Sequence, residues 1–210
     1  MTSPRQPRCG VLLAGGAGTR FGGAFKGLLP LGQERVADGA LRALIQVCDD
    51  VVIAANDAAA DDWFPGHRVV RDREPGLGAL GALDTALRAA NERNVVVCAW
   101  DMPFVTAALL TALIATVDAG ASCCVPVHAD GSHEPLCAAY SPQCAATVST
   151  LLVSGERAAH AIVDAVHGSR WSIAEELSPD VAARTFFNVN TPDDLRRAES
   201  WALTPSIRST

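Results

Sequence analysis

The sequence lacks three features: an apolar run of transmembrane length, a Cys-x-x-C pair and a surplus of basic residues. Hydrophobic residues make up 49% of the chain but fall in short runs, which argues against a membrane protein. The formal net charge is −6, and an acidic chain gains nothing from counterion release on DNA or RNA. We therefore expect neither a membrane nor nucleic acid among its partners.

The seven cysteines do not form a recognisable disulfide framework, because their number is odd and Cys123 and Cys124 are adjacent. No two-by-two spacing indicates a structural zinc site. The N-terminal stretch Met1–Arg8 is polar and lacks the apolar segment of a signal peptide. We therefore expect reduced, mostly buried thiols and a cytoplasmic protein.

Short apolar runs alternate with helical patterns, which is typical of an α/β protein. The pattern predicts a single-domain three-layer α/β/α fold, with a mostly parallel, Rossmann-like N-terminal half and a mixed-sheet C-terminal half. Residues 9–202 form the expected domain, between a flexible N-terminus at 1–8 and a flexible tail at 203–210. Strands are predicted at residues 10–14, 50–55, 68–71, 94–99, 121–127, 135–140 and 169–173, and helices at 35–47, 78–93, 106–117, 142–152, 157–166 and from 191 onward.

A glycine-rich segment directly follows the first predicted strand. It spans Leu13–Lys26 and contains five glycines, followed by Arg20 and Lys26 as its cations. Glycines at this density let backbone N–H groups approach an anion, and the two cations suit a triphosphate. An ordinary glycine-rich turn with solvated cations is the alternative.

The two commonest phosphate motifs do not fit this loop. A Walker A loop needs Ser or Thr after its lysine, and here Gly27 follows Lys26. A dinucleotide fingerprint needs a third glycine where Phe21 stands, and an acid after the second strand, where Asn56 follows two alanines. NAD binding is therefore disfavoured.

A carboxylate closes the most apolar strand. Asp101 precedes Met102-Pro103 at the edge where ligands of open α/β sheets collect, and it suits a Mg²⁺ ion that bridges phosphate oxygens. A loop or capping aspartate is the alternative interpretation. Asp72 follows another strand and begins a loop with three glycines before a helix, which is either a second place for a nucleotide or an ordinary strand–helix connector with a capping function.

Two further segments are weaker candidates. Asn190 could add an oxygen ligand to the metal, although its spacing before Thr191-Pro192 favours a role as helix cap. His128 and the pair His133-Glu134 surround a predicted hairpin turn, where polar side chains usually face water.

Taken in order, these motifs resemble those of the molybdenum cofactor guanylyltransferase family, the MobA-like branch of the nucleotidyltransferases with a glycosyltransferase-A-like fold. The matching segments are Leu13–Gly16 with Arg20-Phe21-Gly22 and Lys26, Asp72 before its glycine loop, Asp101-Met102-Pro103, and Asn188–Leu195. The resemblance covers about residues 9–198. It depends on four ordered motifs, each of which is weak alone.

The resemblance implies a role for each matched residue. Catalysis would rest on Lys26, Asp101 and Arg20, with Arg20 and Lys26 on the β- and γ-phosphates. Nucleotide binding would involve Leu13, Ala14, Gly15, Gly16, Lys26, Asp72 and Asp101. Asp101 and Asn190 would hold Mg²⁺, and Arg157 would lie near the acceptor.

The resemblance also implies the substrates. GTP would donate GMP to the terminal phosphate of molybdopterin or the molybdenum cofactor, and we expect transient contact with molybdoenzyme assembly proteins. Gly15 favours guanine, since cytosine-using relatives more often carry alanine there. Three departures from the family pattern, Phe25, Ala54 and Ala79, leave base and acceptor open. The alternatives are a cytidylyltransferase for the same cofactor, a phospholactate or sugar-phosphate nucleotidyltransferase, and a non-catalytic nucleotide-binding adaptor.

Overall fold

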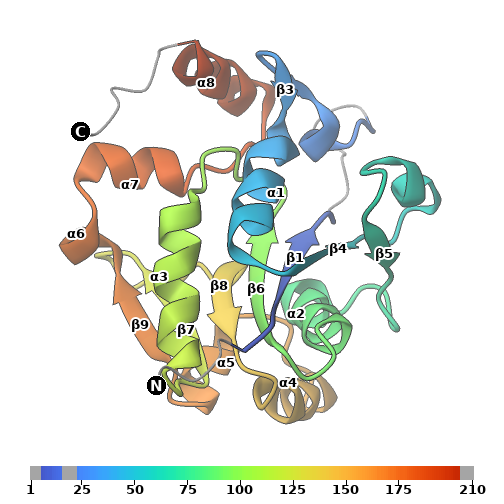
Figure 1. Ribbon diagram of the computed structural model, residues 1–210, viewed down its shortest axis with the longest axis vertical. Helices are drawn as coiled ribbons and strands as arrows, with labels where there is room; N and C mark the ends of the chain where they lie inside the picture. Colours follow the sequence, from blue (N-terminus) through green and yellow to red (C-terminus); the bar gives the residue numbers. More distant parts are fainter. Residues whose placement is uncertain (1–5, 16–22, 204–210) are drawn as a thin grey trace.

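A computed structural model describes residues 6–15 and 23–203, and the following account concerns these residues (Figure 1). The strands are β1 (Arg8–Leu13), β2 (Pro30–Leu31), β3 (Glu34–Arg35), β4 (Asp50–Ala54), β5 (Arg68–Val70), β6 (Asn94–Ala99), β7 (Cys123–Val127), β8 (Cys137–Tyr140) and β9 (Ser169–Ser172). The helices are α1 (Val36–Val47), α2 (Gly78–Ala89), α3 (Ala107–Asp118), α4 (Cys144–Val153), α5 (Ala161–Ala165), α6 (Ile173–Glu176), α7 (Pro179–Thr185) and α8 (Pro192–Ala202), with 3₁₀ helices η2 (Lys26–Leu28) and η3 (Ala58–Asp62).

The main sheet has seven strands in the order β5-β4-β1-β6-β8-β7-β9. From β5 to β6 all neighbours are parallel, whereas β8 runs antiparallel to both β6 and β7, and β9 runs parallel to β7. In Figure 1 the arrow of β8 accordingly points against that of β6. The expected parallel N-terminal half and mixed C-terminal half are confirmed.

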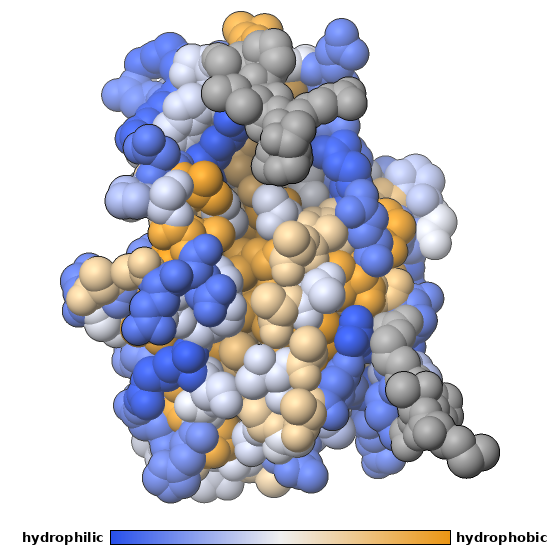
Figure 2. Space-filling view, turned by 60° about the vertical axis from the view of Figure 1, so that its left-hand side comes forward, coloured by the Kyte–Doolittle hydropathy of each residue, from blue (hydrophilic) through white to orange (hydrophobic). Residues whose placement is uncertain are grey.

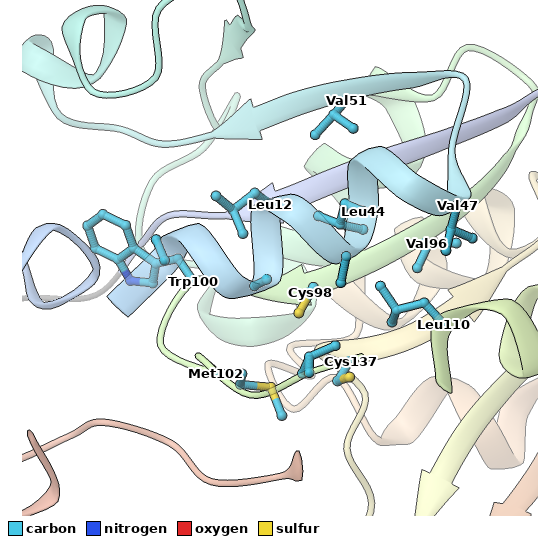
Figure 3. Close-up of a cluster of buried hydrophobic side chains, with 14 of the residues drawn as sticks. Leu12, Leu44, Val47, Val51, Val96, Cys98, Trp100, Met102, Leu110 and Cys137 are labelled. Atoms are coloured by element: carbon cyan, nitrogen blue, oxygen red, sulfur yellow. The ribbon is translucent and has the colours of Figure 1, made fainter. Parts of the chain in front are cut away.

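Alternating side chains on the strands build two apolar layers. Leu12 packs in the cluster formed with α1 and α3, whereas Val11 and Leu13 pack in the cluster formed with α2, α4 and α5. Figure 3 shows the first cluster, where Leu44 of α1 and Leu110 of α3 lie over the sheet. Each fully buried side chain of this size contributes about 1.5–3 kcal/mol, so both sheet faces are firmly covered and the three-layer prediction is confirmed.

Helix α3 turns large side chains inward and small ones outward. Leu109 and Leu113 are buried, while Ala108 and Ala112 are exposed. Figure 2 shows the molecule after a turn that brings the left-hand side of Figure 1 forward. On the face of the molecule seen in this view, apolar residues lie over the middle and hydrophilic residues surround them. Among the described residues, no helix combines the length and apolar character that crossing a membrane requires.

None of the seven cysteines, all of which lie within the described residues, forms a disulfide bond, and six of them are buried. Burial raises the pKa of Cys123 to about 12 and that of Cys144 to about 11. The buried Cys98 thiol has its pKa raised first by a hydrogen bond with Cys137 and then by burial. These thiols stay protonated near neutral pH and serve as packing groups.

Several local predictions were wrong. The predicted helix at 157–166 is helical only in α5, and the backbone before it is irregular because the carbonyl of Arg157 accepts the N–H of Leu80. Helix α2 ends at Ala89, since Asn91 and Glu92 adopt positive φ angles of 51° and 62°. The short elements β2, β3, α6 and α7 lacked a periodic signal long enough to predict. The domain bounds at 9 and 202 stay predictions.

Candidate active site

A cavity of about 810 Å³ lies at the edge of the sheet where the parallel strands end. Its lining includes Leu13 at the end of β1, Ala55 after β4 and Asp101 after β6, together with the loops that precede α2 and α5. Because β8 is antiparallel, its beginning lies at the same edge, and Pro135 and Leu136 complete the wall. The cavity therefore extends from the parallel half to the mixed half of the sheet.

Three predicted residues meet at the centre of this edge. The Nζ of Lys26 donates hydrogen bonds to Oδ2 of Asp101 and, at 2.9 Å, to Oδ1 of Asn190. The side chains of Lys26 and Asp101 are only 19% and 9% exposed. Removing two charges from water costs free energy, and their mutual attraction offsets this cost only at short distance. The ammonium and the carboxylate are therefore held close together. Lys26 is also the only lysine in the sequence.

An aromatic stack fixes the backbone around Lys26. Trp100 stacks on Trp63 with ring centroids 5.3 Å apart, and Phe25 packs on Trp63 at 4.5 Å. Gly27 lies against the same indole: a Cβ there would lie 2.3 Å from a ring atom of Trp100. Phe25, which departs from the family pattern, thus anchors the segment that presents Lys26.

The other two members of the centre are held by backbone contacts. The carbonyl of Asp101 accepts the N–H of Val189 at 2.9 Å, which joins the segment after β6 to the segment before α8. Thr191 caps α8 through a capping box with Asp194. The interpretation of Asn190 as the helix cap was therefore wrong: Thr191 is the cap, which leaves the Asn190 amide to contact Lys26.

Asp72 is held by residues from two neighbouring elements. The Nδ2 of Asn56 donates to its Oδ2 at 2.7 Å, the Oδ1 of Asn56 accepts its backbone N–H at 2.8 Å, and Thr85 donates to its Oδ1. Asp72 and Asn56 both line the cavity beside the ends of β4 and β5. The carboxylate is thus oriented before any ligand arrives, and sequence analysis missed the roles of Asn56 and Thr85.

The start of α2 and Arg157 lie together. The Arg157 carbonyl accepts the N–H of Leu80 at 3.0 Å, and Gly78, at a φ of 68°, lets the chain pass this carbonyl closely. The Arg157 guanidinium donates to the carbonyls of Leu152 and Glu156 and lines a second cavity of about 260 Å³, which also borders Asp72. The acceptor role of Arg157 stays a prediction, with its guanidinium in this second cavity.

The remaining predicted residues divide into two groups. Leu13 and Gly15 line the cavity, and buried Ala14 donates its N–H to the carbonyl of Ala54 at 2.8 Å. A Cβ at Gly15 would meet no protein atom within 4 Å. Gly16 and Arg20 lie outside the described residues.

Comparison with known proteins identifies the family of this chain. The MobA-like NTP transferase domain matches residues 10–170. A Chloroflexus aggregans protein named probable molybdenum cofactor guanylyltransferase is 32% identical, and the match covers 94% of this chain and 96% of that one. The chain belongs to the MobA-like NTP transferase family.

Solved structures share this fold. Molybdopterin-guanine dinucleotide biosynthesis protein A from Archaeoglobus fulgidus is 27% identical, with a TM-score of 0.76 over 92% of this chain and 97% of that one. A Mycobacterium tuberculosis protein, solved in complex with manganese, is 23% identical, with a TM-score of 0.66 over 93% of this chain and 98% of that one. The second likeness concerns the fold alone.

The donor set of this MobA-like NTP transferase fits a divalent cation. Asp101 offers a carboxylate oxygen and Asn190 an amide oxygen, and hard oxygen donors are those that Mg²⁺ and Mn²⁺ take. Both oxygens already contact one cation, the ammonium of Lys26. Asn190 lies beyond the matched stretch 10–170, so only the folded chain brings it to this position.

Proposed function

We propose that this chain transfers GMP from Mg²⁺-bound GTP to the terminal phosphate of molybdopterin or its molybdenum form, with release of pyrophosphate. The observation that carries the proposal is the convergence of Lys26, Asp101 and Asn190 on one edge of a cavity large enough for two substrates. The guanylyltransferase and molybdopterin-guanine dinucleotide biosynthesis relatives support GTP as donor and the cofactor as acceptor.

The chemistry requires positioning more than proton transfer. A terminal phosphate oxygen of the acceptor attacks the α-phosphorus of GTP, the new P–O bond forms, and the bond to the β-phosphate oxygen breaks. A phosphate monoester is already anionic near neutral pH, so no side chain has to remove a proton. Charge neutralisation and alignment therefore account for most of the rate.

Each residue has a defined task in this proposal. Lys26 neutralises the β- and γ-phosphates, assisted by Arg20, and Asp101 with Asn190 would hold Mg²⁺, which supplies further positive charge to the phosphate oxygens. Asp72 contacts the nucleotide from the side of β4 and β5. The backbone of Leu13–Gly16 holds base and sugar.

Turnover of each of the four ribonucleoside triphosphates with molybdopterin and Mg²⁺, read by mass spectrometry, tests the proposal. GTP should give the guanine dinucleotide product and pyrophosphate. Faster turnover of CTP would identify a cytidylyltransferase for the same cofactor. Binding of a triphosphate without pyrophosphate release from any pairing would identify the non-catalytic adaptor.

Gly15 offers a sharper test of base choice. Since a Cβ at this position meets no protein atom within 4 Å, Gly15→Ala should fold like the wild type. Any change in the ratio of GTP to CTP turnover would then arise from contact with the base. We expect Gly15→Ala to lower this ratio several-fold; an unchanged ratio would show that base choice depends on other residues.

A further inference from the structure

The cavity has a third carboxylate, besides Asp72 and Asp101, that the transfer chemistry leaves unused. Glu134 lines the cavity from the segment just before β8, on the opposite side of β6 from Asp72. The N–H of Ala99 bonds to the carbonyl of Leu136 at 2.8 Å, which joins this segment to the end of β6, two residues before Asp101. Glu134 therefore lies at the reaction edge, on the mixed half of the sheet.

A histidine orients this carboxylate. The Nε2 of His128 lies 2.8 Å from Oε1 of Glu134, and an ionised carboxylate accepts only, so the imidazole donates. The His128 ring packs edge-on against Phe186 with centroids 5.6 Å apart. Among the described residues, Oε2 of Glu134 has no hydrogen-bond partner, and the Glu134 side chain is 24% exposed. His128 thus occupies one lone pair of Oε1, and the second lone pair of Oε1 together with Oε2 is available to a ligand.

The charges along the cavity indicate which ligand group this carboxylate meets. Among the described lining residues, Lys26 is the one Lys or Arg, and Glu134 is followed directly in the chain by the apolar lining residues Pro135 and Leu136. A carboxylate beside apolar side chains repels a phosphate. It suits a flat ring with adjacent N–H donors, because its two coplanar oxygens accept from neighbouring N–H groups.

We propose that Glu134, oriented by His128, binds the acceptor through the neighbouring N–H groups of an aminopyrimidinone ring. The ring then lies over the beginning of β8, and the acceptor phosphate extends toward Lys26 and Asp101. Glu134 thereby sets acceptor specificity, and His128 is a positioning residue that acts through it. This inference rests on the proposed function, which assigns the β4–β5 side of the cavity to the nucleotide.

Binding of two small ring compounds tests the inference without turnover. Pterin carries a 2-amino group beside a ring N–H, whereas lumazine carries an oxygen in place of the amino group. With Mg²⁺ and a non-hydrolysable GTP analogue present, the wild type should bind pterin roughly tenfold or more tightly than lumazine, since one charge-assisted hydrogen bond is worth about 1.5–3 kcal/mol. Fluorescence titration measures both affinities.

Variants locate the source of this preference. Glu134→Gln should remove it, and His128→Ala should reduce it, whereas His128→Gln should restore part of it because its amide N–H can replace the Nε2 donor. Glu34→Gln is the matched control, since Glu34 is an exposed carboxylate paired with Arg42. It should bind both compounds like the wild type.

Steady-state kinetics separates this inference from the proposed function. Glu134→Gln should raise the KM for molybdopterin roughly 10- to 100-fold, with the KM for GTP unchanged. A raised KM for GTP instead would show that Glu134 contacts the guanine, and equal affinity for pterin and lumazine in the wild type would refute ring recognition. Normal transfer by Glu134→Gln would overturn the inference and leave the proposed function standing. If the wild type prefers pterin to lumazine but does not turn over GTP, ring recognition by Glu134 stands and the proposed GMP transfer fails.

Discussion

The two halves of the sheet place their functional side chains at opposite ends of their strands. In the parallel half, Asp72 follows β5 and Asp101 follows β6. In the mixed half, Glu134 precedes β8 and reaches the same cavity because β8 is antiparallel to β6. A polar residue in a loop therefore belongs to the site or to the far side of the molecule according to the direction of its strand.

The two halves also differ in how their carboxylates are held. Asp72 receives hydrogen bonds from Asn56 and Thr85 on both oxygens, whereas Glu134 receives one from His128 on a single oxygen. Between these two carboxylates, Lys26 contacts both Asp101 and Asn190, which are distant from it in the sequence. We infer that the Asp72 carboxylate is preorganised for one ligand, whereas the Glu134 carboxylate keeps hydrogen-bond acceptor positions free for another ligand.

The largest effect is expected at the boundary between the halves. Asp101→Asn keeps the shape but removes the charge that pairs with Lys26 and would hold the metal, so pyrophosphate release should fall roughly a hundred- to a thousandfold. Asp118→Asn is the matched control, because Asp118 pairs with Arg8 near the opposite edge of the sheet. Asp101→Asn with normal turnover would remove the metal role.

The next largest effect is the difference between variants of Asp72 in the parallel half and of Glu134 in the mixed half, measured as the KM of each substrate. Asp72→Asn should raise the KM for GTP about tenfold or more, since a charged acceptor of hydrogen bonds becomes neutral, while the KM for the acceptor stays near wild type. Glu134→Gln should show the opposite pattern. If both variants shift the same KM, the two halves do not serve separate substrates.

A smaller effect concerns the stability of the segment that presents Lys26. Gly27→Ala forces a Cβ to within 2.3 Å of the Trp100 ring, and overpacking of this kind costs about 1–3 kcal/mol. Tm should fall by about 2–4 °C for each kcal/mol. Gly15→Ala, with open space around it, is the control. Equal Tm values for the two variants would show that the indole moves aside freely.

The smallest effect belongs to the buried thiols of the mixed half. Because burial raises the pKa of Cys123 to about 12 and of Cys144 to about 11 from an ordinary 9.0, the unfolded chain loses these protons first. Their contribution to stability is complete below pH 9 and is lost as pH rises toward 11 and 12, at about 1.4 kcal/mol per pH unit for each thiol. Urea unfolding in reductant at pH 8 and 10 should show a smaller loss for Cys123→Ala than for the wild type.

Much of the parallel half could be predicted because its strands are apolar runs. A carboxylate directly after such a run indicates the edge of the sheet where ligands of α/β proteins bind. Asp101 and Asp72 were found in this way. Glu134 was ranked as a weak candidate because nothing in the local pattern gives the direction of β8, and the polar side chains of a hairpin turn usually face water. For Asn190 the spacing alone favoured a helix cap, whereas the family resemblance implied a metal ligand, because local spacing does not show which side chain caps α8. The irregular backbone at Arg157 depends on a hydrogen bond from Leu80, which is distant in the sequence.

The sequence by itself determined the seven strands of the main sheet, the two-sided burial of these strands and the kinds of side chain available for phosphate and metal. These follow from local periodicity and from residue chemistry, which act over a few positions. Only the tertiary structure brought Lys26 against Asp101 and Asn190, which lie 75 and 164 residues away along the chain. Strand order and strand direction arise from the packing of the whole sheet, and they decide which loops share a cavity.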